Sequence, residues 1–312
     1  MSAIDTKYFD KYTVRSAEAL KALQDQGKLR GALVITGDEQ QSTTLHKIFY
    51  LMQKAKSGIS EKDKMHLCHA MVATGWDTTT EKEYPEKFSL AQRITRAIRQ
   101  FFGFEVAPPK MFKKEYPLGR PVWTHAVFDK VKTNTVDYFN YADKDVTFLT
   151  LYIPKDEKLR EAFAKNAEDS AKKRTMKFSK ARLINLIFKK QILKRKENQA
   201  RKKLAFAVAD RLLDKEFSQE NNPKAARSFF CMEYALTVLQ TSILSEALSK
   251  DEKVRMKNMD RSVLAAEILS RISNQKPQDT LARAYWTNKI CCQVDPSRMM
   301  SAGVAAVLDE VT

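Results

Sequence analysis

The chain contains four histidines and four cysteines, the residue types that could carry nucleophilic or metal chemistry. The stretch HLCHAMVATG, residues 66–75, places Cys68 between His66 and His69 and continues into an apolar run with β-branched residues. A cysteine beside a histidine can act as a nucleophile with its own base, and a cluster of the two types can bind zinc. The stretch therefore raises three alternatives: a reactive thiol with its base, a metal site, or one half of a catalytic pair.

The first two alternatives are disfavoured by the spacing of these residues. Successive side chains of a strand point to opposite faces, so Cys68 is a poor partner for His69 if the strand begins there. Zinc sites usually need a second pair of ligands, separated by two to four residues. With only eight glycines the chain also lacks a phosphate-binding Gly-rich loop, so neither a metal nor a cofactor is predicted. The other residues considered as metal ligands, which lack the required spacing, are His46, His125, Cys291 and Cys292.

Cys231 is the better candidate for a nucleophile. It lies in the sequence RSFFCMEYAL, residues 227–236, at the start of a helix predicted over residues 224–249. The backbone N–H groups and the positive end of a helix dipole stabilise a thiolate at such a position and can lower its pKa from about 8.5. The alternative is that Cys231 is a small buried apolar residue beside Phe229 and Phe230. A base close to the thiol would distinguish the two.

Two histidines could supply that base. His69 opens a predicted strand, and His125 lies in the middle of another, between apolar neighbours. A buried imidazole needs a hydrogen-bond partner, and the ring of His69 on the next strand would provide one for His125. A base oriented by a third polar group is the general arrangement for activating a thiol. In a second alignment His125 is the base and Asp137 is the carboxylate that orients it.

The apolar pattern predicts an α+β fold that forms a single domain over residues 1–312. An amphipathic helix over residues 86–103 and the prolines that follow it indicate a helical insertion at 76–120, and a basic helical segment is expected at 172–215. The predicted strands lie at 31–36, 70–74, 122–127, 135–139 and 146–153. A short N-terminal helix is expected first, and further helices are predicted at 43–56, 155–173, 178–215, 260–273, 279–292 and 297–310.

The net charge of +17 is concentrated in residues 172–203, where Glu197 is the single acid among many lysines and arginines. A run of this kind is commonly the solvated face of a helix whose other face is packed. It could also bind anionic lipid or an acidic protein, through Lys189, Lys190, Lys194 and Arg195. Nucleic acid is a disfavoured partner, because no aromatic residues for base stacking are interleaved with the charges.

The composition also bounds where the chain works. No stretch approaches eighteen apolar residues, so no transmembrane segment is predicted. The first twenty residues lack the apolar core of a secretory signal, which indicates a cytoplasmic protein or one exported without a standard signal. Four cysteines in 312 residues do not form a disulfide framework, and free thiols are expected.

The order of these parts resembles that of the circularly permuted papain-like cysteine hydrolases of the NlpC superfamily, in the YiiX-like branch related to lecithin:retinol acyltransferases. Two departures stand out: Cys68 occupies a position where the family often has Ser or Thr, and Met232 follows the cysteine where Ser is common. The matching segments, in chain order, are Leu33–Asp38, 43–56, His69–Gly75, Trp123–His125, Val146–Pro154 and Phe230–Ala235.

This resemblance implies an antiparallel sheet packed on the helix that carries the nucleophile. It also implies a thiol-dependent hydrolase or acyltransferase, of the peptidase, amidase or acyl-transfer type, that cleaves an amide, thioester or ester in a peptide, lipid or acyl substrate. Cys231 would be the nucleophile, His69 the base and His125 the orienting residue. YiiX-like proteins are widespread in bacteria, so a bacterial effector is one expectation. The alternative is a catalytically inactive module of the same fold that binds anionic lipid or an acidic protein.

Overall fold

The computed structural model of the chain divides into two compact units, which are described separately. The first unit combines Met1–Gly75 with Pro121–Thr312, and the second is Trp76–Arg120. The structure describes residues 8–39, 67–86, 89–101, 106–127, 130–136, 138–139, 146–172, 177–178, 202, 205–206, 208–210, 212–213, 228–229, 231–246, 248–273 and 308.

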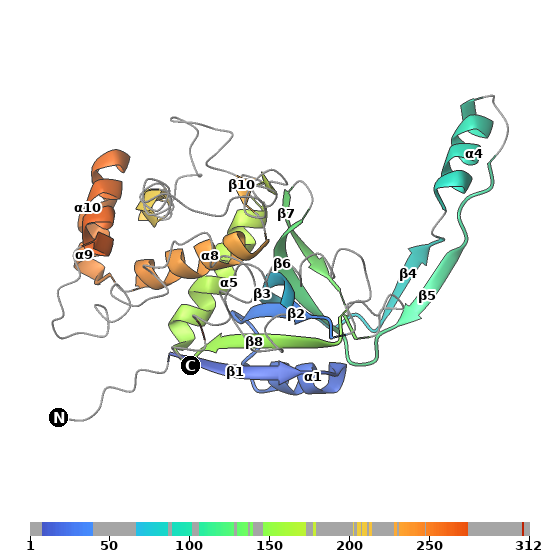
Figure 1. Cartoon of the computed structure of the whole chain (residues 1–312), viewed down its shortest axis with the longest axis horizontal. Coiled ribbons are helices and arrows are strands. Elements are labelled where there is room, and N and C mark those ends of the chain that lie inside the picture. Colours follow the sequence, from blue (N-terminus) through green and yellow to red (C-terminus); the bar gives the residue numbers. More distant parts are fainter. Residues whose placement is uncertain are drawn as a thin grey trace. The chain divides into compact units, whose positions relative to one another are not determined.

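The centre of the first unit is an antiparallel sheet with the strand order β1-β8-β2-β3-β6-β7 (Figure 1). The predicted α+β class with an antiparallel sheet is therefore confirmed. Four of its strands coincide with predicted ones, whereas β1 was not predicted and β7 replaces the strand expected at 135–139. The bounds are β1 Phe9–Val14, β8 Phe148–Pro154, β2 Leu33–Gly37, β3 Leu67–Asp77, β6 Arg120–Val127 and β7 Lys130–Thr135.

The central strands read as continuous apolar runs because both of their faces are covered. All seven residues of β8, FLTLYIP, are buried, and so are all five of β2. The strand β8 pairs with β1 on one side and with β2 on the other, so no edge of it is open. In the outer strand β1 only the end residues Phe9 and Val14 are buried, and the four residues between them are partly or fully exposed.

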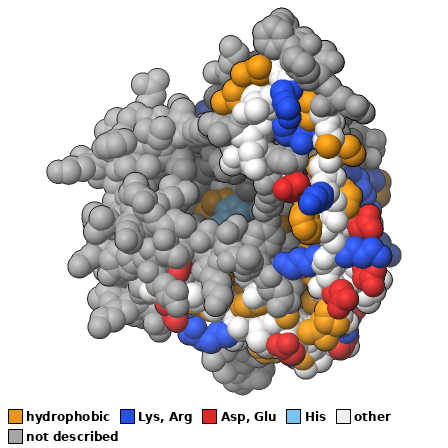
Figure 2. Space-filling model, turned by 90° about the vertical axis from the view of Figure 1, so that its right-hand side faces the viewer, with side chains coloured by type: hydrophobic (Ala, Val, Ile, Leu, Met, Phe, Trp, Pro, Cys, Tyr) orange, Lys and Arg blue, Asp and Glu red, His pale blue; other side chains and the backbone are white. Residues whose placement is uncertain are grey.

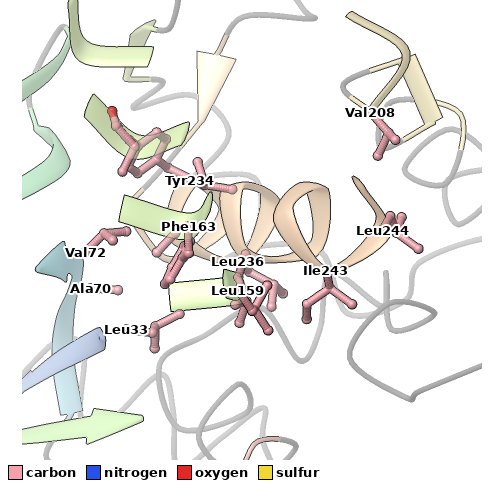
Figure 3. Packing of buried hydrophobic residues seen from close by; sticks show 14 of the residues in the cluster. Leu33, Ala70, Val72, Leu159, Phe163, Val208, Tyr234, Leu236, Ile243 and Leu244 are labelled. Carbon is pink, nitrogen blue, oxygen red and sulfur yellow. The ribbon is translucent and has the colours of Figure 1, made fainter. Parts of the chain in front are cut away.

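Two helices, α5 (Glu157–Lys172) and α8 (Cys231–Glu246), pack against each other beside this sheet. Two buried side-chain hydrogen bonds join them: Asn166 Nδ2 donates to Ser242 Oγ at 2.7 Å, and the hydroxyls of Ser170 and Tyr234 lie 2.7 Å apart. Figure 3 shows side chains from the strands and both helices in one apolar cluster, which includes Leu33, Ala70, Val72, Leu159, Phe163, Tyr234 and Leu236.

The remaining described helices differ from the predictions at their ends. The helix predicted over 224–249 begins only at Cys231, because Ser228–Phe229 form the short strand β10, which pairs in parallel with β9 at Lys177–Phe178. A separate helix that was not predicted, α9, follows α8 and begins with a capping box between Ser249 and Glu252. The other bounds are α1 Ala17–Asp25, α9 Lys250–Lys257 and α10 Arg261–Ser273.

The second unit contains a two-stranded ribbon in addition to the expected helix. Strand β4 (Glu81–Pro85) pairs antiparallel with β5 (Met111–Glu115), and α4 (Leu90–Phe101) lies between them in sequence. Within this unit Figure 1 shows α4 beyond the end of the ribbon. The helix of the insertion predicted at 76–120 is present, but its two strands were not predicted, because these charged segments lack the apolar alternation that identifies a strand.

None of the described helices is long and apolar enough to cross a membrane.

Candidate active site

The two candidate histidines meet on adjacent strands of the sheet, β3 and β6. Nε2 of His69 lies 2.8 Å from Nδ1 of His125, and the ring centroids are 5.0 Å apart with the ring planes inclined by 65°. His125 is buried and His69 is half-buried. The sequence predicted this contact from the need of a buried imidazole for a partner, and the predicted contact is confirmed.

A local irregularity between β2 and β3 holds His69 in place. The register shifts between Thr36 and Gly37, so that Thr36 is opposite His69 while Gly37 is opposite Leu67. The backbone N–H of His69 donates to Oγ1 of Thr36 at 3.1 Å, and the same hydroxyl donates to the carbonyl of His69 at 3.4 Å. A β-bulge can re-aim a side chain next to an active site, and here it lies at the candidate base.

Asn134 extends the histidine pair on its other side. The pairing of β6 with β7 places Trp123 opposite Asn134 and His125 opposite Lys132, so Asn134 is a diagonal neighbour of His125. Nε2 of His125 and Oδ1 of Asn134 are both buried, and neither has a hydrogen-bond partner within the part of the chain that the structure describes. Asn134 lies near enough to His125 to raise the pKa of its imidazole, although no hydrogen bond joins the two side chains in this structure.

Either ring can donate the hydrogen bond between the two histidines, depending on the tautomers. If Nε2 of His125 carries the proton of that ring, Nδ1 of His125 is the acceptor. Nε2 of His69 then carries the proton of the hydrogen bond between the rings. The consequence is that Nδ1 of His69 has a free lone pair and can accept a proton.

Burial keeps both rings uncharged at neutral pH. It lowers the pKa of His69 to about 4. The pKa of His125 is lowered to about 2, first by burial and then by the charges of His69 and Lys132, and Asn134 opposes this only in part. Both histidines are therefore neutral proton acceptors near pH 7, and neither is an imidazolium.

Cys231 is the first residue of α8, and its thiol lies beside the sheet at Ala70, the residue that follows His69. The backbone N–H groups of Ala70, Met232 and Cys231 itself act on the thiol and lower its pKa, but burial outweighs them and the pKa is raised overall. The lowered pKa expected at a helix N-terminus was therefore wrong. The dipole and amides are present as predicted, but desolvation of the thiolate has the larger effect.

The thiol lies beside the backbone of Ala70, which follows His69 in the strand. Among the described residues, no hydrogen bond joins Sγ of Cys231 to either imidazole. Tyr138 also lies close to the thiol: burial, and then the charge of Cys231, raise the pKa of its phenol, and its ring packs 6.3 Å from that of Trp123. Figure 2 shows histidine atoms beside hydrophobic atoms.

Sequence reasoning missed Asn134 and Tyr138. The strand expected after His125 was placed at 135–139, whereas β7 is Lys130–Thr135, so Asn134 lies outside the predicted strand and Tyr138 outside the observed one. Cys68 has its backbone in β3, so it belongs to the same strand as His69. Several residues and helices of the predictions lie outside the described residues: His46, His66, Asp137, Lys189, Lys190, Lys194, Arg195, Cys291, Cys292, the helices at 43–56 and 279–292, and, apart from Leu308, the helix at 297–310.

A search for metal ligands and the comparisons with known proteins also bear on the chemistry of this site. Among the residues that the structure describes, no group of three or more His, Cys, Asp or Glu side chains could hold a metal ion. Comparison of the chain with protein-family models, with curated proteins and with solved structures gave no match.

Proposed function

We propose that the chain is a thiol-dependent hydrolase or acyltransferase that acts on an amide, thioester or ester bond, with the element order of a permuted papain-like fold. The observation that carries the proposal is the hydrogen bond between His69 and His125, because it orients a neutral imidazole. His69 directly precedes Ala70, whose backbone N–H lies at the thiol of Cys231. The sheet and its histidines precede the nucleophile helix in the chain, which is the order of the permuted fold.

The mechanism is general-base catalysis by His69. Sγ of Cys231 attacks the carbonyl carbon while its proton passes to Nδ1 of His69, and the carbonyl π electrons move to the oxygen. When the tetrahedral intermediate collapses, the leaving group takes the proton from His69 and the acyl group stays on the sulfur. Water or an acceptor alcohol, amine or thiol then attacks the thioester with the same base. The backbone N–H of Cys231 is the donor assigned to the oxyanion.

The raised pKa of the thiol decides when the proton moves. A preformed thiolate–imidazolium pair would need a thiol of low pKa and a histidine of raised pKa, and both shifts are in the opposite direction here. The proton is therefore transferred during the attack and not before it. His125 holds the ring of His69 in the tautomer that accepts this proton, and it does not itself contact the thiol.

The first test is acylation of the whole protein by p-nitrophenyl acetate at pH 7.5, followed by release of nitrophenolate and by peptide mass spectrometry. We expect the acetyl group on Cys231, and we expect Cys231→Ser to lose nearly all of the rapid nitrophenolate release. Cys68→Ser is the matched control and should react as the wild type does. Equal acetylation of Cys231 and Cys68, with no loss of rate in Cys231→Ser, would contradict the proposal.

A second candidate function is a non-catalytic module that binds anionic lipid or an acidic protein. The raised pKa of Cys231 and the absence of a hydrogen bond from its thiol to the described histidines favour this candidate. Such a module would use the basic residues Lys189, Lys190, Lys194 and Arg195, and their replacement by Gln should weaken association and flatten its salt dependence. Cys231→Ser should then leave binding unchanged, and its rate of nitrophenolate release should equal that of the wild type.

Asn134→Ala is expected to slow acetylation of Cys231 by about 10- to 100-fold, the usual effect of removing a group that orients a histidine. The side-chain oxygen near His125 is lost, so the proposed tautomer of the two rings is no longer favoured. Asn134→Asp keeps the acceptor and should restore most of the rate. The negative charge of the new aspartate favours the imidazolium form, so the pKa of the two histidines rises. As the pH is lowered, activity is then lost at a higher pH than in the wild type. A pH–rate profile from pH 4 to 8 measures both effects, and a wild-type profile in both variants would remove Asn134 from the mechanism.

A further inference from the structure

The helix α4 has two isoleucines on one face, Ile94 and Ile98, that the described residues of the second unit do not cover. Ile94 and Ile98 are 50% and 51% exposed, although isoleucines four positions apart on a helix share one face. The described side chains between and beside them, from Thr95 to Gln100, are exposed as well except for the half-buried Arg96. A surface helix of a globular protein normally packs its apolar stripe against a core. This one does not, so its stripe is available for a partner.

Further apolar side chains are exposed where the ribbon joins this helix. Met111 and Phe112 are 53% and 56% exposed, and they pair with Pro85 and Tyr84 at the end of β4 that leads into α4. The exposed large hydrophobic residues of the described part of the chain are thus concentrated in this unit, with Val254 and Val263 as the others. The unit therefore presents an apolar end formed by α4 and the adjoining ends of the two strands.

The charge on α4 indicates the chemistry of the partner. The helix sequence LAQRITRAIRQF contains three arginines and no acid, and Arg99, next to Ile98, is exposed. A short helix with an apolar stripe and only cationic charge is typical of segments that lie in the interface of an anionic membrane. Twelve residues span about 18 Å as a helix, too short to cross the hydrocarbon core.

Two alternatives fit these residues less well. Pairing of this face with the same face of a second copy would bring the arginines of both helices together, and like charges oppose that contact. A rigid acidic protein would contact one side of the ribbon, but Met111 and Phe112 are consecutive in a strand and point to opposite faces. A fluid bilayer surface can surround both side chains at once.

We propose that the α4 face, defined by Ile94, Ile98 and Arg99, binds the surface of an anionic lipid bilayer with the helix lying in the interface. The isoleucines enter the boundary between headgroups and acyl chains, and Arg99 contacts the phosphates. The proposal is independent of the chemistry at Cys231, because it involves only residues of the second unit.

The test is flotation of the full chain with vesicles of phosphatidylcholine alone and with vesicles of equal parts phosphatidylcholine and phosphatidylglycerol. We expect binding to the anionic vesicles only, at least a tenfold loss of binding in Ile94→Ser/Ile98→Ser, and weaker binding in Arg99→Gln. The matched control is Val254→Ser/Val263→Ser, which removes two apolar side chains that are at least as exposed, 63% and 53%, from α9 and α10. This control should bind as the wild type does.

Four outcomes would overturn the proposal. The first is equal binding by the wild type and the isoleucine variant, which would place the lipid contact in the basic residues elsewhere in the chain. The second is equal binding to neutral and anionic vesicles, and the third is no binding to either. The fourth is self-association of the wild type in light scattering that Ile94→Ser/Ile98→Ser abolishes without any effect on vesicles.

Discussion

His69→Ala is expected to slow the acetylation of Cys231 by p-nitrophenyl acetate at pH 7.5 by about 10²- to 10⁴-fold, the usual contribution of a positioned general base. The large effect follows from the raised pKa of the thiol, since little thiolate exists at this pH without a base to accept the proton. Added imidazole should restore part of the rate, because the alanine leaves room beside Ala70. The initial rate of nitrophenolate release measures both.

His69→Gln separates catalysis by His69 from a structural role. Its side-chain amide carries both a donor and an acceptor and can hydrogen-bond to Nδ1 of His125, so the contact between β3 and β6 is retained, but an amide does not accept a proton at neutral pH. We expect the rate in this variant to be as low as in His69→Ala, with unfolding at the wild-type temperature. A wild-type rate in His69→Gln would show that the histidine has only a structural role.

Phe163→Ala is expected to lower the free energy of unfolding by about 3–5 kcal/mol, the range for removal of a fully buried phenylalanine. Phe163 lies on α5 with none of its surface exposed, and its ring lies in the cluster that joins the sheet to α5 and α8 (Figure 3). Truncation leaves a cavity at the layer that supports the helix of Cys231. Urea denaturation followed by circular dichroism measures the change.

Phe112→Ala is the matched control for this prediction. Phe112 is 56% exposed on β5, so its removal leaves no cavity, and the free energy of unfolding should change by no more than about 0.5 kcal/mol. A loss below about 1.5 kcal/mol in Phe163→Ala would mean that α5 does not pack on the sheet as described. In that case the helix layer would not hold Cys231 beside β3.

Part of the fold could be predicted because its signal is local. The runs that form β2, β3, β6 and β8 are apolar and β-branched over consecutive residues, and such a run forms a strand wherever it is buried. The helix α5 was predicted in the same way, from a repeat of apolar residues that places them on one face. The sequence also predicted the contact between His69 and His125, because a buried imidazole needs a partner and the neighbouring strand carries one.

Other elements could not be predicted because their residues carry weak local signals. The outer strands β1 and β7 contain several polar and charged residues, and they are strands because of the strands they pair with. The ribbon of β4 and β5 likewise exists through the antiparallel pairing of two charged segments, in which Glu83 lies opposite Lys113. Pairing between distant segments is not encoded in either segment alone.

By itself the sequence determined which residues could do chemistry and that Cys231 stands at the start of a helix. Only the tertiary structure decided the protonation of these groups. The amides of Ala70 and Met232 lower the pKa of the thiol, as a helix start predicts. Burial raises this pKa by more, so the net shift is upward. The same burial lowers the pKa of His69 to about 4. Desolvation depends on every segment packed around a group, so a short stretch such as HLCHAMVATG identifies the histidine but cannot give its charge.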